Sequence, residues 1–134
     1  MNTTTGRFDL TRWDEEVYDP APDSAPDAAR LQRVALAKAF EGGISGTSTA
    51  QLLQAFSPDG SAAYVGIERV TGEVDGRKGS FVLRHSAVGS AAGGSMSVDV
   101  VPGSGTDDLA GLRGDLTIDR AEDGEHTYAF TYEL

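Results

Sequence analysis

The chain contains no cysteine, so its 134 residues cannot form a disulfide framework, a thiol nucleophile or a cysteine-ligated zinc site. No apolar run approaches the roughly 18 residues that a membrane-spanning helix requires. Residues 1–7 lack the apolar stretch and cleavage pattern of a secretory signal. From these absences we expect a soluble, cytoplasmic protein.

Basic side chains are also scarce, with 11 Lys and Arg against 21 Asp and Glu and a formal net charge of −10. Proteins that bind nucleic acid or anionic membranes neutralise phosphates with lysine and arginine. We therefore expect neither nucleic acid nor a membrane as a partner. The acidic excess lies at both ends of the chain, as is typical of charged, exposed segments that keep a protein in solution.

The motifs of metal and cofactor chemistry are missing as well. The two histidines have no carboxylates at a ligand spacing, so no metal site is expected. A Gly-X-Ser-X-Gly nucleophile elbow does not occur. The segment 101–106 is glycine-rich, but it lacks the lysine and the following helix of a phosphate-binding loop, which favours a turn. We expect a protein that works without a cofactor.

Short alternating runs separated by glycine are what the chain does contain. Its 17 glycines lie between apolar runs, as the turns and bulges of an all-β fold require. The runs predict about eight strands, among them 8–18, 51–56, 62–74, 80–88, 96–100, 112–118 and 126–134. Such a meander removes its exposed edges by closing into a barrel, whose interior has room for packed side chains or one small ligand.

Details within these runs refine the prediction. The alternation changes phase between Leu10 and Trp13, which predicts a bulge near Thr11 and Arg12. Residues 19–28 hold three of the five prolines and are expected to form an exposed loop within a single domain, 1–134. For residues 28–40, local propensity on its own favours a helix over a strand.

Three segments carry a resemblance to a known family: 63–86, 100–106 together with 109–114, and the ending that begins His126-Thr-Tyr. From Trp13 to its C-terminus the chain resembles a bacterial domain-of-unknown-function family, related in fold to the allene oxide cyclase-like β-barrels. The resemblance implies a single closed antiparallel barrel. It also implies that residues 31–46 form one long strand, against their local helical preference.

Glu68 and His85 are the candidate catalytic residues. They lie on two runs joined by Asp75-Gly76, a hairpin signal that pairs residues whose numbers sum to about 151. His85 then lies opposite Gly66, two residues along from Glu68, within reach of a long side chain. If both point inward they form an acid/base pair. Alternatively, Glu68 pairs with an arginine on the outside, Arg69 or Arg84, and His85 is a core residue.

Five aromatic or histidine side chains are candidates for binding a ligand, with packing in the core as the alternative role for each. They are Trp13, Tyr64, Phe81, His126 and Tyr128. The expected ligand is a small apolar molecule. The fold resemblance favours a cofactor-free isomerase or cyclase that uses Glu68 and His85 as acid/base groups, and the alternative is a non-catalytic carrier or sensor.

The run 63–70 is apolar on both of its faces. Tyr64 and Val70 share one face, whereas Val65 and Ile67 share the other. A strand of an isolated barrel should have one polar face. We therefore expect the outer face of this strand to contact another subunit in a symmetric homo-oligomer.

Overall fold

The computed structural model describes residues 1–134 as one closed antiparallel barrel of eight strands that follow one another in chain order. The all-β barrel expected from the sequence is thus confirmed. A short 3₁₀ turn, Asp107–Leu109, is the one helical element, and no helix is long and apolar enough to cross a membrane. The strands are β1 (Asn2–Asp19), β2 (Arg30–Gly42), β3 (Ile44–Phe56), β4 (Ala62–Val74), β5 (Arg77–Ser90), β6 (Gly93–Val100), β7 (Arg113–Arg120) and β8 (His126–Glu133).

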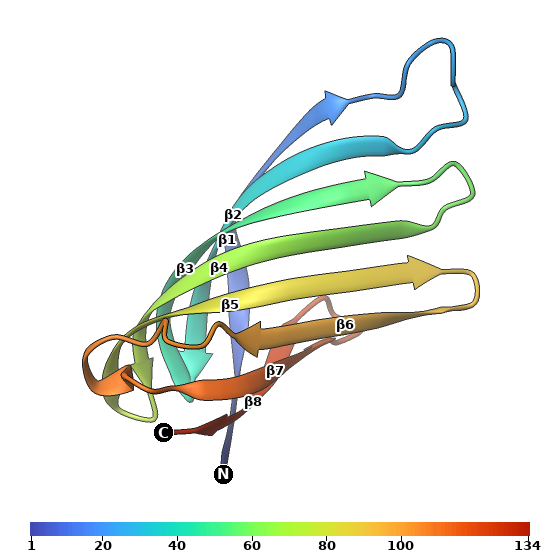
Figure 1. Ribbon diagram of the computed structural model, residues 1–134. Coiled ribbons are helices and arrows are strands. Elements are labelled where there is room, and N and C mark those ends of the chain that lie inside the picture. The colour runs from blue at the N-terminus through green and yellow to red at the C-terminus, as the bar shows by residue number, and fades with distance from the viewer.

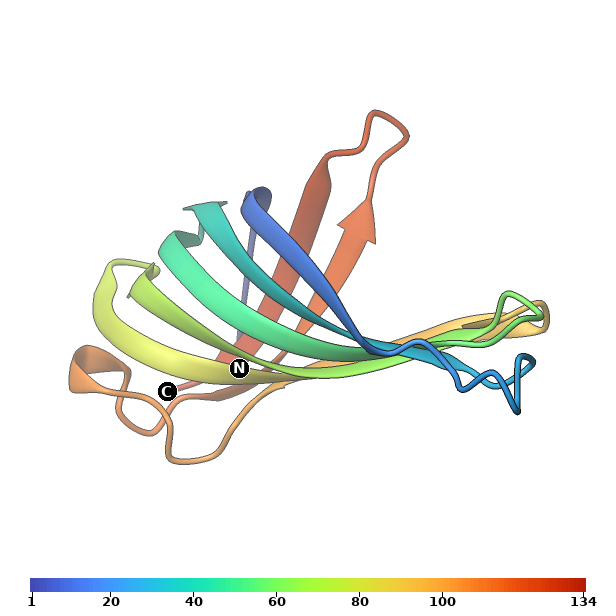
Figure 2. The same cartoon turned by 90° about the horizontal axis from the view of Figure 1, so that it is seen from above.

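The barrel has one packed end and one open end. Figure 1 shows the loops after β1, β3 and β5 gathered at one end of the long strands, away from both chain termini. Seen from above in Figure 2, these long strands extend beyond the closed part as a curved sheet. Residues 2–8 of β1 pair with β8 and residues 6–19 pair with β2, which closes the barrel.

The segment 31–46 corrects one prediction in part. It is extended, as the resemblance implies, but it contains nearly all of β2, a turn and the start of β3 rather than one strand. Gly42 adopts a left-handed φ of 102°, and the Gly43 N–H donates to the Thr5 carbonyl at 2.9 Å, which fixes the turn. Residues of β2 form a strand despite their local helical preference, because pairing with strands on both sides buries alternate side chains of β2.

The phase change predicted in β1 is present as a bulge. The pairing of β1 with β2 shifts between Leu10 and Arg12, so that Phe8 and Trp13 both lie opposite inward-facing residues of β2, Phe40 and Leu36. The bulge therefore brings the single tryptophan to the inner side of the barrel at its open end.

A cluster of 15 buried apolar residues fills the end of the barrel near the termini. Phe81 stacks on Phe130 within it, with ring centroids 5.9 Å apart. The Tyr128 hydroxyl accepts a hydrogen bond from the Ile44 N–H at 2.8 Å and so binds the β2–β3 turn. Phe81 and Tyr128 were candidate ligand-binding residues. Both are buried in this cluster, and neither is among the residues that line the inner cavity described below.

The glycine-rich segment 101–106 is a turn, as its composition predicted. It runs along the edge of β5 that β6 leaves uncovered. The Ser80 N–H donates to the Thr106 hydroxyl at 2.9 Å, and the Val82 N–H donates to the Ser104 hydroxyl at 3.0 Å. The segment therefore satisfies backbone groups of β5 where β6 and β7 diverge.

Candidate functional site

A cluster of four polar side chains lies inside the barrel, one from each of β2, β3, β4 and β5: Lys38, Ser48, Glu68 and His85. Glu68 is at its centre and is completely buried. Its Oε1 accepts from His85 Nε2 at 2.7 Å and from Lys38 Nζ at 3.2 Å, while its Oε2 accepts from the Ser48 hydroxyl at 2.5 Å. Both oxygens of this carboxylate therefore accept hydrogen bonds within this group of four side chains, the Glu68 cluster.

The turn at Asp75-Gly76 sets the relative positions of Glu68 and His85. It gives the predicted register, with Glu68 opposite Leu83 and His85 opposite Gly66. A side chain at Gly66 would collide with the Leu52 side chain and the Gln51 carbonyl, so glycine is required beside the imidazole.

The alternative pairing of Glu68 with an outer arginine does not occur. Arg84 points outward and forms a two-bond ion pair with Asp99, at 2.7 and 3.0 Å. Glu68 instead faces the interior from the opposite side of the sheet. Both Glu68 and His85 therefore lie on the inner side of the barrel, which the sequence had left open.

The environment of Glu68 favours its charged form. Burial alone would raise the pKa of this carboxyl. The hydrogen bond from His85 and the charge of Lys38 oppose that effect, and the Ser48 hydroxyl adds a further donor. Together they lower the pKa from 4.5 to about 2, so Glu68 is a carboxylate at neutral pH.

This charge state fixes the hydrogen-bonding role of His85. Because a carboxylate can only accept, the Nε2 of His85 carries a proton and donates it to Glu68. The other ring nitrogen, Nδ1, has no hydrogen-bond partner within the chain, and it is not among the fully buried atoms that lack one. His85 therefore has one nitrogen held by Glu68 and one available to a bound molecule.

An inner cavity of about 200 Å³ adjoins the Glu68 cluster. Four of the predicted site residues line it, namely Trp13, Tyr64, His85 and His126. The remaining wall is mainly apolar, with Phe8, Leu10, Leu36, Ala50, Leu52, Met96 and Ile118, and includes Gln54. Lys38 also lines the cavity, and sequence analysis missed it. Its position in the alternation Val34, Leu36, Lys38, Phe40 was the available signal.

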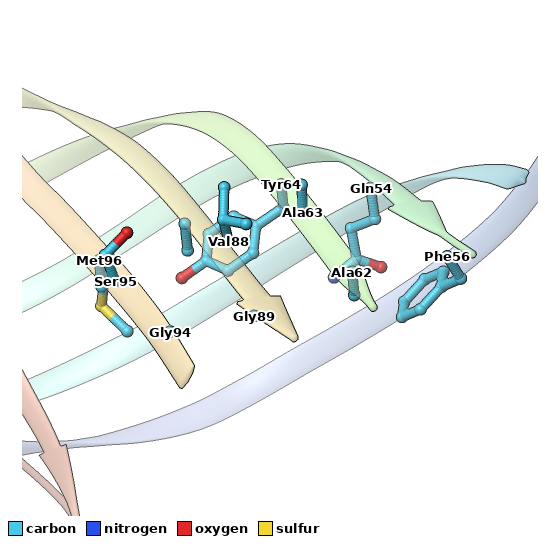
Figure 3. Close-up of a pocket in the computed structure, with 11 residues that line it drawn as sticks. Gln54, Phe56, Ala62, Ala63, Tyr64, Val88, Gly89, Gly94, Ser95 and Met96 are labelled. Atoms are coloured by element: carbon cyan, nitrogen blue, oxygen red, sulfur yellow. The ribbon is translucent and has the colours of Figure 1, made fainter. Parts of the chain in front are cut away.

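An outer groove of about 440 Å³ lies beside the inner cavity on the extended sheet (Figure 3). Gln54, Tyr64 and Met96 line both spaces. In Figure 3 the Tyr64 ring extends from β4 over β5, toward Met96 on β6. The shared residues make the groove a direct neighbour of the inner cavity.

Neighbouring groups determine the protonation of two other polar side chains that line the cavity, His126 and Tyr64. Burial, Arg120 and Lys38 lower the pKa of His126, whose ring lies 4.9 Å from the Phe8 ring and stays neutral at pH 7. Burial and the Glu68 charge raise the pKa of the Tyr64 hydroxyl, which remains a donor. No group of three or more His, Asp or Glu is placed to hold a metal ion.

These features define a small closed β-barrel with a polar cluster at the floor of an apolar cavity. The chain belongs to the DUF3224 family, whose model carries the description "Protein of unknown function" and matches residues 4–132. It is similar to a protein with unknown function of this family from Shewanella oneidensis MR-1, known from its crystal structure. The two chains share 35% identity and a TM-score of 0.88, over 100% of this chain and 98% of the other. No curated protein matches the chain.

Proposed function

We propose that the barrel binds a small, largely apolar molecule in the inner cavity and acts on it as a cofactor-free isomerase or cyclase. The observation that carries the proposal is the position of His85. One imidazole nitrogen is hydrogen-bonded to a buried carboxylate, and the other has no hydrogen-bond partner within the chain. His85 lines an apolar cavity. An imidazole held in one tautomer can take a proton from one atom of a ligand and return it to another.

Glu68 has a different part in this proposal from the acid/base role expected from sequence. It is completely buried and both oxygens are occupied, so it does not reach a ligand. We assign it as a positioning residue, which orients His85 and stabilises the imidazolium after proton uptake. Lys38 and Tyr64 supply donors that can bind an oxygen of the ligand.

A non-catalytic carrier or sensor is the second candidate. The observation that favours it is the outer groove beside the cavity, which shares Gln54, Tyr64 and Met96 with it, because an open groove next to the site suits capture and release of a ligand. Catalysis more often needs a site that excludes water.

The first test is a native mass spectrum of freshly purified protein, followed by chromatography of whatever small molecule it retains. If the protein is an isomerase or cyclase, it converts this molecule into a product of equal mass and different retention time. His85→Ala then slows the conversion by roughly 100-fold or more. A carrier returns the same compound, whether or not His85 is present. Ser86→Ala, on the outer face beside His85, is the matched control and should behave like the wild type. Unchanged retention and conversion in His85→Ala would contradict the assigned site.

We further propose that the protein is a homo-oligomer assembled through the outer face of β4. Val65 and Ile67 are each 54% exposed there, and Leu53, paired with Val65, is 49% exposed. Covering these neighbouring side chains on a second copy would remove their apolar surface from water. Light scattering at micromolar concentration should give a multiple of the chain mass, and Val65→Asp should reduce it. A strictly monomeric wild type would contradict the proposed interface.

A further inference from the structure

Lys38 is a buried amine placed against the cavity. The chain has two lysines, and only Lys38 is in the interior, with 8% of its side chain exposed against 78% for Lys78. Its Nζ lies 4.4 Å from the centre of the Phe8 ring, and both residues line the inner cavity. One carboxylate oxygen, Glu68 Oε1, contacts both the Lys38 amine and His85 Nε2. An amine, an imidazole and an apolar space therefore meet at one point.

We propose that Lys38 is a nucleophile that forms an iminium with the carbonyl carbon of a small aldehyde or ketone bound in the inner cavity. This inference rests on the proposed binding of small molecules there and names their class. A lysine in an apolar pocket beside an acid/base group is the arrangement that carbonyl-condensing sites require.

The reaction balances without a further reactant. His85 Nδ1 takes one proton from the Lys38 ammonium, through a water molecule or the carbonyl oxygen of the substrate. The free amine then attacks the carbonyl carbon, a C–N bond forms, and one proton passes from that nitrogen to the carbonyl oxygen to give a neutral carbinolamine. Protonated His85 returns its proton to the hydroxyl, which leaves as water while the nitrogen lone pair forms the C=N bond. Overall, an ammonium and a carbonyl give an iminium and water.

The surroundings of Lys38 suit both ends of this reaction. Ammonium and iminium carry the same single positive charge on the same nitrogen, so the ion pair with buried Glu68 is present before and after the reaction. While the nitrogen is neutral, protonated His85 carries the positive charge beside Glu68. Tyr64 lines the same cavity, and the raised pKa of its hydroxyl keeps that group protonated as a donor for a carbonyl oxygen. No buried charge is left unpaired at any stable stage.

Butanal with sodium cyanoborohydride tests the inference, because the hydride converts an iminium into a stable butyl-lysine. Peptide mass spectrometry then compares Lys38 with the exposed Lys78 in the same sample. Modification of Lys38 should saturate with butanal and, at low concentration, exceed that of Lys78 by about tenfold or more despite its burial. His85→Ala should slow modification of Lys38 by roughly 100-fold and leave Lys78 unaffected. Lys78→Arg should leave modification of Lys38 unchanged.

The indole N–H resonance of Trp13 distinguishes binding in the cavity from formation of the iminium at Lys38, because Trp13 lines the cavity and is the single tryptophan. If butanal shifts this resonance while Lys38 stays unmodified or reacts more slowly than Lys78, the iminium is overturned and ligand binding stands. If butanal and butanol both leave the resonance unshifted and Lys38 is unmodified, the iminium and the proposed cavity binding are both overturned.

Discussion

Replacing Glu68 with leucine is expected to lower the free energy of unfolding by about 3–5 kcal/mol, since it leaves a buried ammonium without its counter-charge. Lys38 is 8% exposed in its side chain and has Glu68 as its single ion-pair partner. The His85 Nε2 proton loses its acceptor in the same variant. Urea unfolding followed by circular dichroism at pH 7 gives the measurement.

The double variant Lys38→Met/Glu68→Leu separates the charge from the packing. Apolar residues of similar volume in place of a buried ion pair should restore stability to within about 1–2 kcal/mol of the wild type. Asp99→Asn is the matched control, because it breaks the exposed ion pair with Arg84 and should cost less than about 1 kcal/mol. If the double variant is as unstable as Glu68→Leu alone, lost packing rather than an unpaired charge explains the effect.

Acid is expected to remove the stability that Glu68 contributes, and this is the second-largest effect that we expect. The pKa of Glu68 is about 2 in the folded protein against 4.5 for an unperturbed carboxyl, so the unfolded chain binds the extra proton first as pH falls. The contribution is therefore fully present above about pH 5 and is lost as pH falls toward 2, and it amounts to roughly 3 kcal/mol.

Comparing the wild type with Glu68→Gln isolates this one carboxyl from the other acidic residues. The difference in free energy of unfolding between the two proteins should be constant from neutral pH down to about pH 5. It should then shrink by roughly 3 kcal/mol as the pH approaches 2. A difference that stays the same over the whole range would mean that Glu68 is not held as a carboxylate by Lys38 and His85.

Alternation and turn chemistry predicted most of the fold and part of the site. The Asp75-Gly76 turn has two residues, which leaves one register for β4 and β5, and that register placed Glu68 diagonal to His85. The period of two in β8 likewise placed His126 and Tyr128 on one inner face. Local rules of this kind need no knowledge of the rest of the barrel.

Depth along the barrel could not be predicted in this way. Phe81 and His85 share the inner face of β5, but Phe81 lies in the packed cluster and His85 lies at the cavity. Alternation gives the side of the sheet on which a residue lies, whereas its depth depends on how all eight strands are staggered. For the same reason, the sequence could not show that Phe81 and Tyr128 lie in the packed cluster, outside the lining of the inner cavity.

Lys38 was missed for a related reason. A lysine within an alanine-rich segment of helical propensity is typical of a solvated helix face. Only the pairing of β2 with strands on both sides turns Lys38 inward, next to a carboxylate from β4 that is distant in sequence. The surroundings of Lys38 therefore depend on closure of the barrel and cannot be predicted from the sequence of β2 alone.

Binding of small molecules in the inner cavity is the central claim, and mapping of chemical shifts in a ¹⁵N-labelled sample tests it most directly. A library of small apolar carbonyl compounds and alcohols is added to the protein, and the shifted amide and indole resonances are mapped onto the barrel. The account predicts that bound compounds shift the Trp13 indole together with Leu52 and Tyr64, which line the cavity. Shifts confined to the outer face around Val65 and Ile67, or none at millimolar concentration, would contradict it.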